Sequence, residues 1–98
     1  MLESFVEEDP SDPFNYYALA MELRHKDKAK SIQLLHQIII DFPDYLPSYF
    51  QLASFYLDDD MRTEAAELIK KAIQLAINQK NQKTLAELRQ LLSSLENE

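Results

Sequence analysis

The sequence contains no glycine in its 98 residues. Phosphate-binding loops of the Walker and Rossmann kinds need glycine for close approach of the backbone, so neither kind is expected. The same absence argues against a nucleophile elbow and against an EF-hand loop, because both depend on glycine at a defined position. Several classes of enzyme and of calcium-binding protein are therefore excluded before any motif is considered.

Cysteine is also absent, which excludes disulfides, thiolate metal sites and a cysteine nucleophile. No run approaches 18 apolar residues, and the acidic N-terminus lacks the apolar run of a signal peptide, so a cytoplasmic location is expected. Lysine and arginine number 10 against 17 aspartates and glutamates, a net charge of −7. Nucleic acid and anionic membrane surfaces are therefore not expected as partners, since basic residues supply most of the affinity for both.

The apolar residues that are present recur at helical spacing and predict an all-α chain. Asp12, followed by Pro13, and Asp27 are expected helix N-caps. Asp60 is expected to cap a later helix, while Asn78 and Asn81 are the expected positions of left-handed backbone. The expected helices are Leu2–Glu8, Pro13–His25, Lys28–Phe42, Pro47–Leu57, Met61–Asn78 and Lys83–Leu95.

Each expected helix carries one apolar stripe that predicts its buried face. The expected core residues are Tyr16, Leu19, Ala20, Leu23, Ile32, Leu35, Ile38, Ile39, Tyr49, Leu52, Ala53, Tyr56, Ala65, Leu68, Ile69, Ala72, Ile73, Leu75, Leu85, Leu88, Leu91, Leu92 and Leu95. Neither a strand pattern nor a linker rich in glycine and serine interrupts this series, so a single domain is expected.

The segment Phe42–Ala53 repeats an earlier part of the chain. Seven of its residues align with residues 33 positions earlier, counted from the sequence numbers: Pro43, Asp44, Tyr45, Tyr49, Phe50, Leu52 and Ala53 align with Pro10, Ser11, Asp12, Tyr16, Tyr17, Leu19 and Ala20. Ala65 aligns with Ser31 at an offset of 34. The first copy is therefore expected to have a turn between its helices that is one residue shorter. A self-match at a period of about 34 residues is typical of a helical repeat array.

These residues resemble the tetratricopeptide repeat (TPR), a helix–turn–helix unit with small residues where its helices cross. The matching positions are Tyr16 and Tyr49, Leu19 and Leu52, Ala20 and Ala53, the group Ala65, Ile69 and Ala72, and the closing Pro43. The resemblance implies a single α-solenoid domain over 1–98, like small bacterial proteins of two TPRs and a capping helix. Its parts would be a half-repeat helix at 2–8, repeats at 12–43 and 44–78, and a capping helix at 82–96.

The resemblance also implies a non-catalytic protein–protein interaction module that binds a peptide or helix in a concave groove lined by the first helix of each repeat. Independently, Tyr17 and Met21 lie four residues apart and outside the core stripe, so they share another helix face. The aromatic residues Tyr17 and Phe50 either contact a partner or pack between repeats. Arg24 either anchors a partner carboxylate or complements its helix end. The expected groove residues are Phe14, Tyr17, Met21, Arg24, His25, Phe50, Ser54, Leu57 and Gln90.

A structural homodimer is the alternative function, formed through the groove or through a face with Leu34 and Ile40, although packing of these two under the N-terminal helix is the preferred interpretation. The Lys and Asn clamp that some family members use for a peptide carboxylate is absent. The two histidines, His25 and His36, lie 11 residues apart, counted from the sequence, and form no recognisable metal site. No catalytic constellation appears, so neither an enzyme nor a cofactor is expected.

Overall fold

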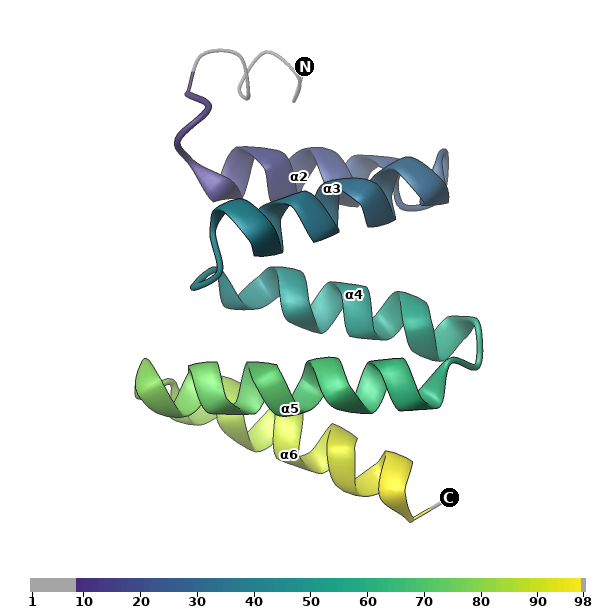
Figure 1. The fold of residues 1–98 in the computed structure, drawn as a ribbon, viewed down its shortest axis with the longest axis vertical. Coiled ribbons are helices and arrows are strands. Elements are labelled where there is room, and N and C mark those ends of the chain that lie inside the picture. The colour runs from purple at the N-terminus through teal and green to yellow at the C-terminus, as the bar shows by residue number, and fades with distance from the viewer. Residues whose placement is uncertain (1–8, 98) are drawn as a thin grey trace. The chain divides into compact units, whose positions relative to one another are not determined.

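The computed structural model describes residues 9–97, and these form helices joined by short turns with no strand (Figure 1). The helices are α2 (Pro13–Leu23), α3 (Lys28–Asp41), α4 (Leu46–Asp58), α5 (Arg62–Asn78) and α6 (Gln82–Glu96). The expected all-α helical repeat is confirmed, with helix ends that differ from the expected ones by one or two residues. The expected helix Leu2–Glu8 lies outside the described residues.

The chain divides into two compact units, Met1–Ser48 and Tyr49–Glu98. In the first unit α2 and α3 pack against each other as an antiparallel pair. In the second unit α5 packs against α6, and α4 leads into α5 through the three-residue turn 59–61 (Figure 1). Each unit is therefore built from neighbouring antiparallel helices, as a repeat of helix–turn–helix type requires.

Three helices begin at a capping side chain. The Asp12 carboxylate accepts a hydrogen bond of 3.0 Å from the backbone N–H of Phe14, and Pro13 occupies the first helical position of α2. Asp27 caps α3 by accepting from Lys30 N–H at 3.2 Å. Asn81 caps α6 by accepting from Thr84 N–H at 3.2 Å. Two of the three predicted aspartate caps, Asp12 and Asp27, are confirmed, and each satisfies a backbone donor that the helix leaves without an internal partner.

Two helices end in the left-handed backbone that glycine usually supplies. After α4, Asp60 has φ 60°, and the N–H groups of Asp60 and Met61 donate to the carbonyls of Leu57 and Tyr56. After α5, Lys80 has φ 56°, and the same pattern links Lys80 and Asn81 to Ile77 and Ala76. Both are Schellman endings, in which the residue after the C-cap must be left-handed.

These endings overturn two expectations. Asp60 does not cap α5, because it is used to end α4; Met61 is the N-cap and makes no side-chain capping bond. The left-handed residue after α5 is Lys80 and neither Asn78 nor Asn81. In a Schellman ending the left-handed residue is the first one after the C-cap, whatever its type, and after α5 this residue is Lys80. Asn81 is the N-cap of α6 instead.

The two repeats differ in the length of the first helix. The helix starts confirm the offsets, since Pro13 and Leu46 differ by 33 and Lys28 and Arg62 by 34. However, α2 has 11 residues and α4 has 13, while the turn of the first repeat, 24–27, is one residue longer than 59–61. The expectation of a shorter first turn is therefore wrong. At the end of α2 the Arg24 N–H bonds to the Met21 carbonyl, three residues back, at 3.4 Å, and no left-handed residue follows.

The predicted stripes form most of the core. Buried members include Leu19, Ala20, Leu35, Ile38, Tyr49, Leu52, Ala53, Ala65, Ile69, Ala72, Leu85 and Leu88, and the remaining predicted residues are half-buried. Five further residues are buried that the stripes did not include, namely Ser31, Leu46, Ser48, Phe55 and Ala76. Because three of these lie on α4, this helix buries a wider face than a single stripe predicts.

Candidate interaction site

The candidate residues of the first unit lie along α2 and just beyond its end. Phe14 is 58% exposed, and Tyr17 and Met21 are half-buried on α2. Arg24 and His25 are exposed. We expected both within the helix, but Arg24 is the C-cap and His25 lies in the turn, because the helix hydrogen bonding stops at Leu23.

Tyr17 makes an aromatic contact with Tyr45. The two ring centroids are 5.7 Å apart and the ring planes meet at 63°, an edge-to-face arrangement that aromatic quadrupoles favour. Burial raises the pKa of Tyr17 above its ordinary value, and the Arg24 charge opposes this rise. Tyr17 thus uses part of its ring for packing within the first unit, while the remainder stays accessible to solvent.

A second ring pair lies beside the first. The centroids of Tyr16 and Phe42 are 5.9 Å apart, and the Tyr16 hydroxyl donates to the Pro10 carbonyl at 2.9 Å. Burial raises the pKa of Tyr45 above its ordinary value, with smaller contributions in the same direction from Tyr17 and from the Asp12 charge. The two pairs bring aromatic side chains from α2 against the segment that joins α3 to α4.

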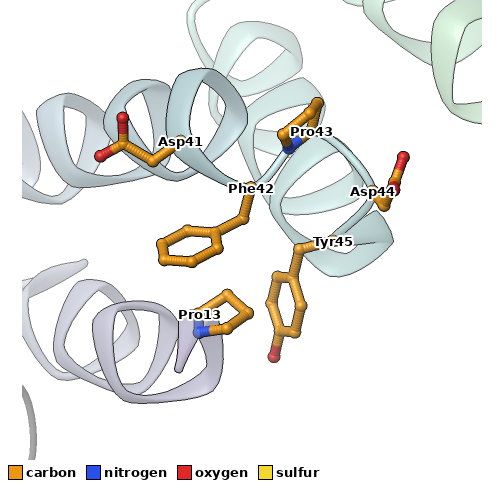
Figure 2. A pocket seen from close by; sticks show the side chains of 6 residues that line it. All are labelled: Pro13, Asp41, Phe42, Pro43, Asp44 and Tyr45. Carbon is orange, nitrogen blue, oxygen red and sulfur yellow. The ribbon is translucent and has the colours of Figure 1, made fainter. Parts of the chain in front are cut away.

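An open hollow of about 400 Å³ lies at this junction. Figure 2 shows the side chains that line it, which are Pro13, Asp41, Phe42, Pro43, Asp44 and Tyr45. The sequence pattern marks this loop as part of the repeat and does not predict it as a site. The available signal was a pair of aromatics, Phe42 and Tyr45, set among two prolines and two aspartates at one turn.

The second unit carries the other candidate residues. Phe50 is 37% exposed on α4, and Ser54 and Leu57 are half-buried further along the same helix. The Ser54 hydroxyl donates to the Phe50 carbonyl at 3.1 Å, so the serine is partly engaged by its own helix. Gln90 is exposed on α6. Phe50 is therefore the candidate in this unit that offers the most apolar surface.

Outside the candidate groove, the face of α3 that we considered for a dimer is unevenly exposed, because Leu34 is half-buried and Ile40 is 71% exposed. Both His25 and His36 are exposed, and residues 9–97 contain no group of three His, Asp or Glu side chains that could hold a metal ion. Within the same range, every helix is too short or too polar to cross a membrane.

Comparison with solved structures identifies the family. The solution NMR structure of a tetratricopeptide repeat domain protein from Salinibacter ruber superimposes with a TM-score of 0.84, at 31% sequence identity, over 91% of this chain and 91% of that one. The chain belongs to the tetratricopeptide repeat family. A crystal structure of a TPR domain protein from the same organism gives a TM-score of 0.80 at 31% identity, over 87% of this chain and 97% of that one.

No family model matches the chain, and no match was found among curated proteins. Membership of the TPR family therefore comes from the two solved structures together with the repeated residues described above. As a TPR protein, the chain is a protein–protein interaction module in general terms.

Proposed function

We propose that this TPR protein binds a peptide or helix of a partner protein through the off-core side chains of the first helix of each repeat. The observation that carries the proposal is the exposure of large aromatic side chains on both of these helices, Phe14 on α2 at 58% and Phe50 on α4 at 37%. In the TPR family the first helices line the concave side of the array, and peptides bind there.

The side chains around these aromatics suit a mixed contact. Met21 and Leu57 add half-buried apolar surface, and the exposed Arg24 and His25 add polar groups at the end of α2. Aromatic residues, methionine and arginine are enriched in protein interfaces, and an exposed apolar patch often marks an interaction site. The net charge of −7 favours a neutral or basic partner. Recognition of this kind needs neither a cofactor nor catalysis.

A pull-down from lysate of the source cell tests the proposal when it is repeated with a double variant, Phe14→Ala with Phe50→Ala. Phe14 is 58% exposed and Phe50 37% exposed, so truncation of Phe50 carries the larger cost in stability and the fold of the double variant is checked directly. Tyr17 is a poorer choice because its ring also packs on Tyr45. The matched control is Ile77→Ala, which removes an exposed apolar side chain (41%) from α5, the second helix of its repeat.

Loss of specific partners with the double variant, and their retention with the control, is the expected result. Equal capture by both variants would refute the assignment of these two helices to partner binding. Circular dichroism of each variant shows whether the fold is kept.

A homodimer is the second candidate, and the 71% exposure of Ile40 on α3 favours it. Light scattering after size exclusion separates the two functions. A mass that rises with concentration, and that Ile40→Glu returns to the monomer value, supports the dimer. A monomeric mass at all concentrations would rule out the homodimer.

A further inference from the structure

The first unit concentrates its positive charge at the turn between α2 and α3. All of its lysine and arginine residues lie within the segment 24–30, and they are Arg24, Lys26, Lys28 and Lys30. We call this segment the basic turn; it runs from the C-cap of α2 to the third residue of α3. Arg24, Lys26 and Lys30 are exposed. The chain as a whole is acidic, so the basic turn is a local exception.

Most carboxylates of the first unit lie too far away to neutralise the basic turn. In the described residues four of them lie at the other end of the antiparallel pair, where α2 begins and α3 ends, namely Asp9, Asp12, Asp41 and Asp44. Figure 1 shows these two ends of the pair. Helix α3 has 14 residues. At about 1.5 Å per residue it separates the ends by about 20 Å, well beyond the Debye length of about 8 Å at physiological salt.

Two carboxylates are closer in sequence to the basic turn. Glu22 is exposed in the last turn of α2, and the Asp27 carboxylate accepts the Lys30 N–H at 3.2 Å as the cap of α3. The cations therefore outnumber the nearby carboxylates. Within residues 9–97 no ion pair involves the side chains of Arg24, Lys26 or Lys30. These three charges are thus available to another molecule.

Helix stability explains only part of the basic turn. A cation near a helix C-terminus is favourable, which suits Arg24 and Lys26 at the end of α2. A cation in the first turn is unfavourable, yet Lys28 and Lys30 occupy the first and third positions of α3. At the offset of 34, Lys30 aligns with Glu64, which places a favourable negative charge in the first turn of α5. The repeat therefore does not require a lysine here, and residues that oppose local stability are expected at functional sites.

We propose that the basic turn binds an acidic segment of a partner protein, one that carries several aspartates or glutamates. Three of the four cations are lysines, which are flexible point charges. They suit carboxylates spaced along a segment, whereas a single phosphate group is better matched by the paired donors of arginine. Nucleic acids and anionic membranes present extended negative surfaces that the acidic remainder of the chain would repel. The inference goes beyond the proposed function, since Lys26, Lys28 and Lys30 lie outside the groove set.

Titration of the full chain with an acetylated and amidated hexaglutamate peptide, followed by the backbone amide signals in NMR, tests the proposal. The amides of 24–30 are expected to shift together and to saturate, and added salt should weaken the binding. The matching hexaglutamine peptide has nearly the same shape without the charges, and it should leave these amides in place. The turn between α5 and α6, with Lys80 and Lys83, is an internal reference that should respond less.

Two double variants with the same change in net charge locate the binding. Lys26→Gln with Lys30→Gln should weaken hexaglutamate binding by about threefold or more, the effect of two exposed charge pairs. The control, Lys70→Gln with Lys71→Gln on the exposed side of α5, should stay within about 1.5-fold of the original chain. Because Lys30→Gln removes a cation from the first turn of α3, the urea midpoint should not fall, so unfolding would not explain a loss of binding.

The proposal is overturned if hexaglutamine shifts the same amides, or if the control weakens binding as much as the test variant, since the attraction would then be unspecific. Tighter binding of a single-stranded oligothymidine at 24–30 would contradict it in favour of nucleic acid. Should the double variant at Lys26 and Lys30 unfold, Lys26→Gln alone decides the outcome, because Lys26 lies between the helices. The Phe14→Ala, Phe50→Ala variant should bind hexaglutamate like the original chain, so failure of the groove proposal would leave this one standing.

Discussion

Two fully buried serines of the first unit provide a sharp test of the packing described above. Ser31 on α3 and Ser48 on α4 are both 0% exposed. The Ser31 hydroxyl donates to the Ala20 carbonyl at 2.6 Å, near the end of α2, where carbonyls lack helical partners. The Ser48 hydroxyl is buried with no hydrogen-bond partner in the described residues. Replacing each serine with alanine removes a buried hydroxyl oxygen, which makes a hydrogen bond at Ser31 and makes none at Ser48.

The expected changes in the free energy of unfolding have opposite signs. Ser31→Ala loses a buried hydrogen bond and leaves a carbonyl without it, which should cost about 1–2 kcal/mol. Ser48→Ala removes a buried hydroxyl that makes no bond, so stability should stay the same or rise by about 1 kcal/mol. Alanine also has the higher helix propensity, a gain of up to ~0.5 kcal/mol that both variants share.

Urea denaturation followed by circular dichroism measures the difference. With a slope of about 1–3 kcal/mol per molar urea, a gap of about 2 kcal/mol should separate the two midpoints by about 1 M. Ser94→Ala, at an exposed position on α6, supplies the propensity reference. Equal midpoints for the two buried variants, or a larger loss for Ser48→Ala, would refute the hydrogen-bond assignment.

Three further predictions concern helix ends and tyrosines. Lys80→Gly should raise the free energy of unfolding by about 1 kcal/mol because it relieves left-handed strain. Gln79→Gly should lower the free energy of unfolding, because Gln79 has φ −86° and gains nothing from glycine. Urea midpoints measure both changes. Asp27→Ala should lower the free energy of unfolding by about 1 kcal/mol in the same assay because α3 loses its N-cap. Asp27→Asn should keep most of the original free energy of unfolding, because asparagine is also a good N-cap. The pKa values of Tyr17 and Tyr45 are raised above the ordinary 10.0, so their contribution to stability is present below pH 10 and is lost as the pH rises through the folded pKa values. Stability measured against pH should therefore fall above pH 10, and replacing both tyrosines with phenylalanine should flatten that fall; an unchanged slope would contradict the burial of these hydroxyls.

The sequence was sufficient for the five helices of residues 9–97 and for the family because both rest on local, repeated information. The spacing of apolar residues and the aspartate caps can be recognised within a single helix. The offset of 33 to 34 residues aligns the helices of the first repeat with those of the second. The ends of the helices were less predictable. At Asp60 and Lys80 the conformation is imposed by a hydrogen-bonding pattern over six residues, which overrides the preference of the residue itself.

The hollow at the α3–α4 loop could not be predicted for a different reason. Its lining depends on Tyr17 holding Tyr45 and on Tyr16 holding Phe42, contacts between residues that lie 28 and 26 positions apart in the sequence numbering. No local pattern encodes such contacts. The buried Ser31 is a similar case, because its hydroxyl is satisfied by a carbonyl of the preceding helix.

The central claim is that exposed aromatics on the first helices of the repeats bind the partner. Its most direct test is the dissociation constant of a captured partner, measured by calorimetry for the Phe14→Ala, Phe50→Ala double variant and for Ile77→Ala. Interface aromatics commonly contribute more than 1 kcal/mol each, so the double variant should bind at least about tenfold more weakly, and the control within about twofold of the original chain. Equal affinities for the double variant and the original chain would contradict the claim.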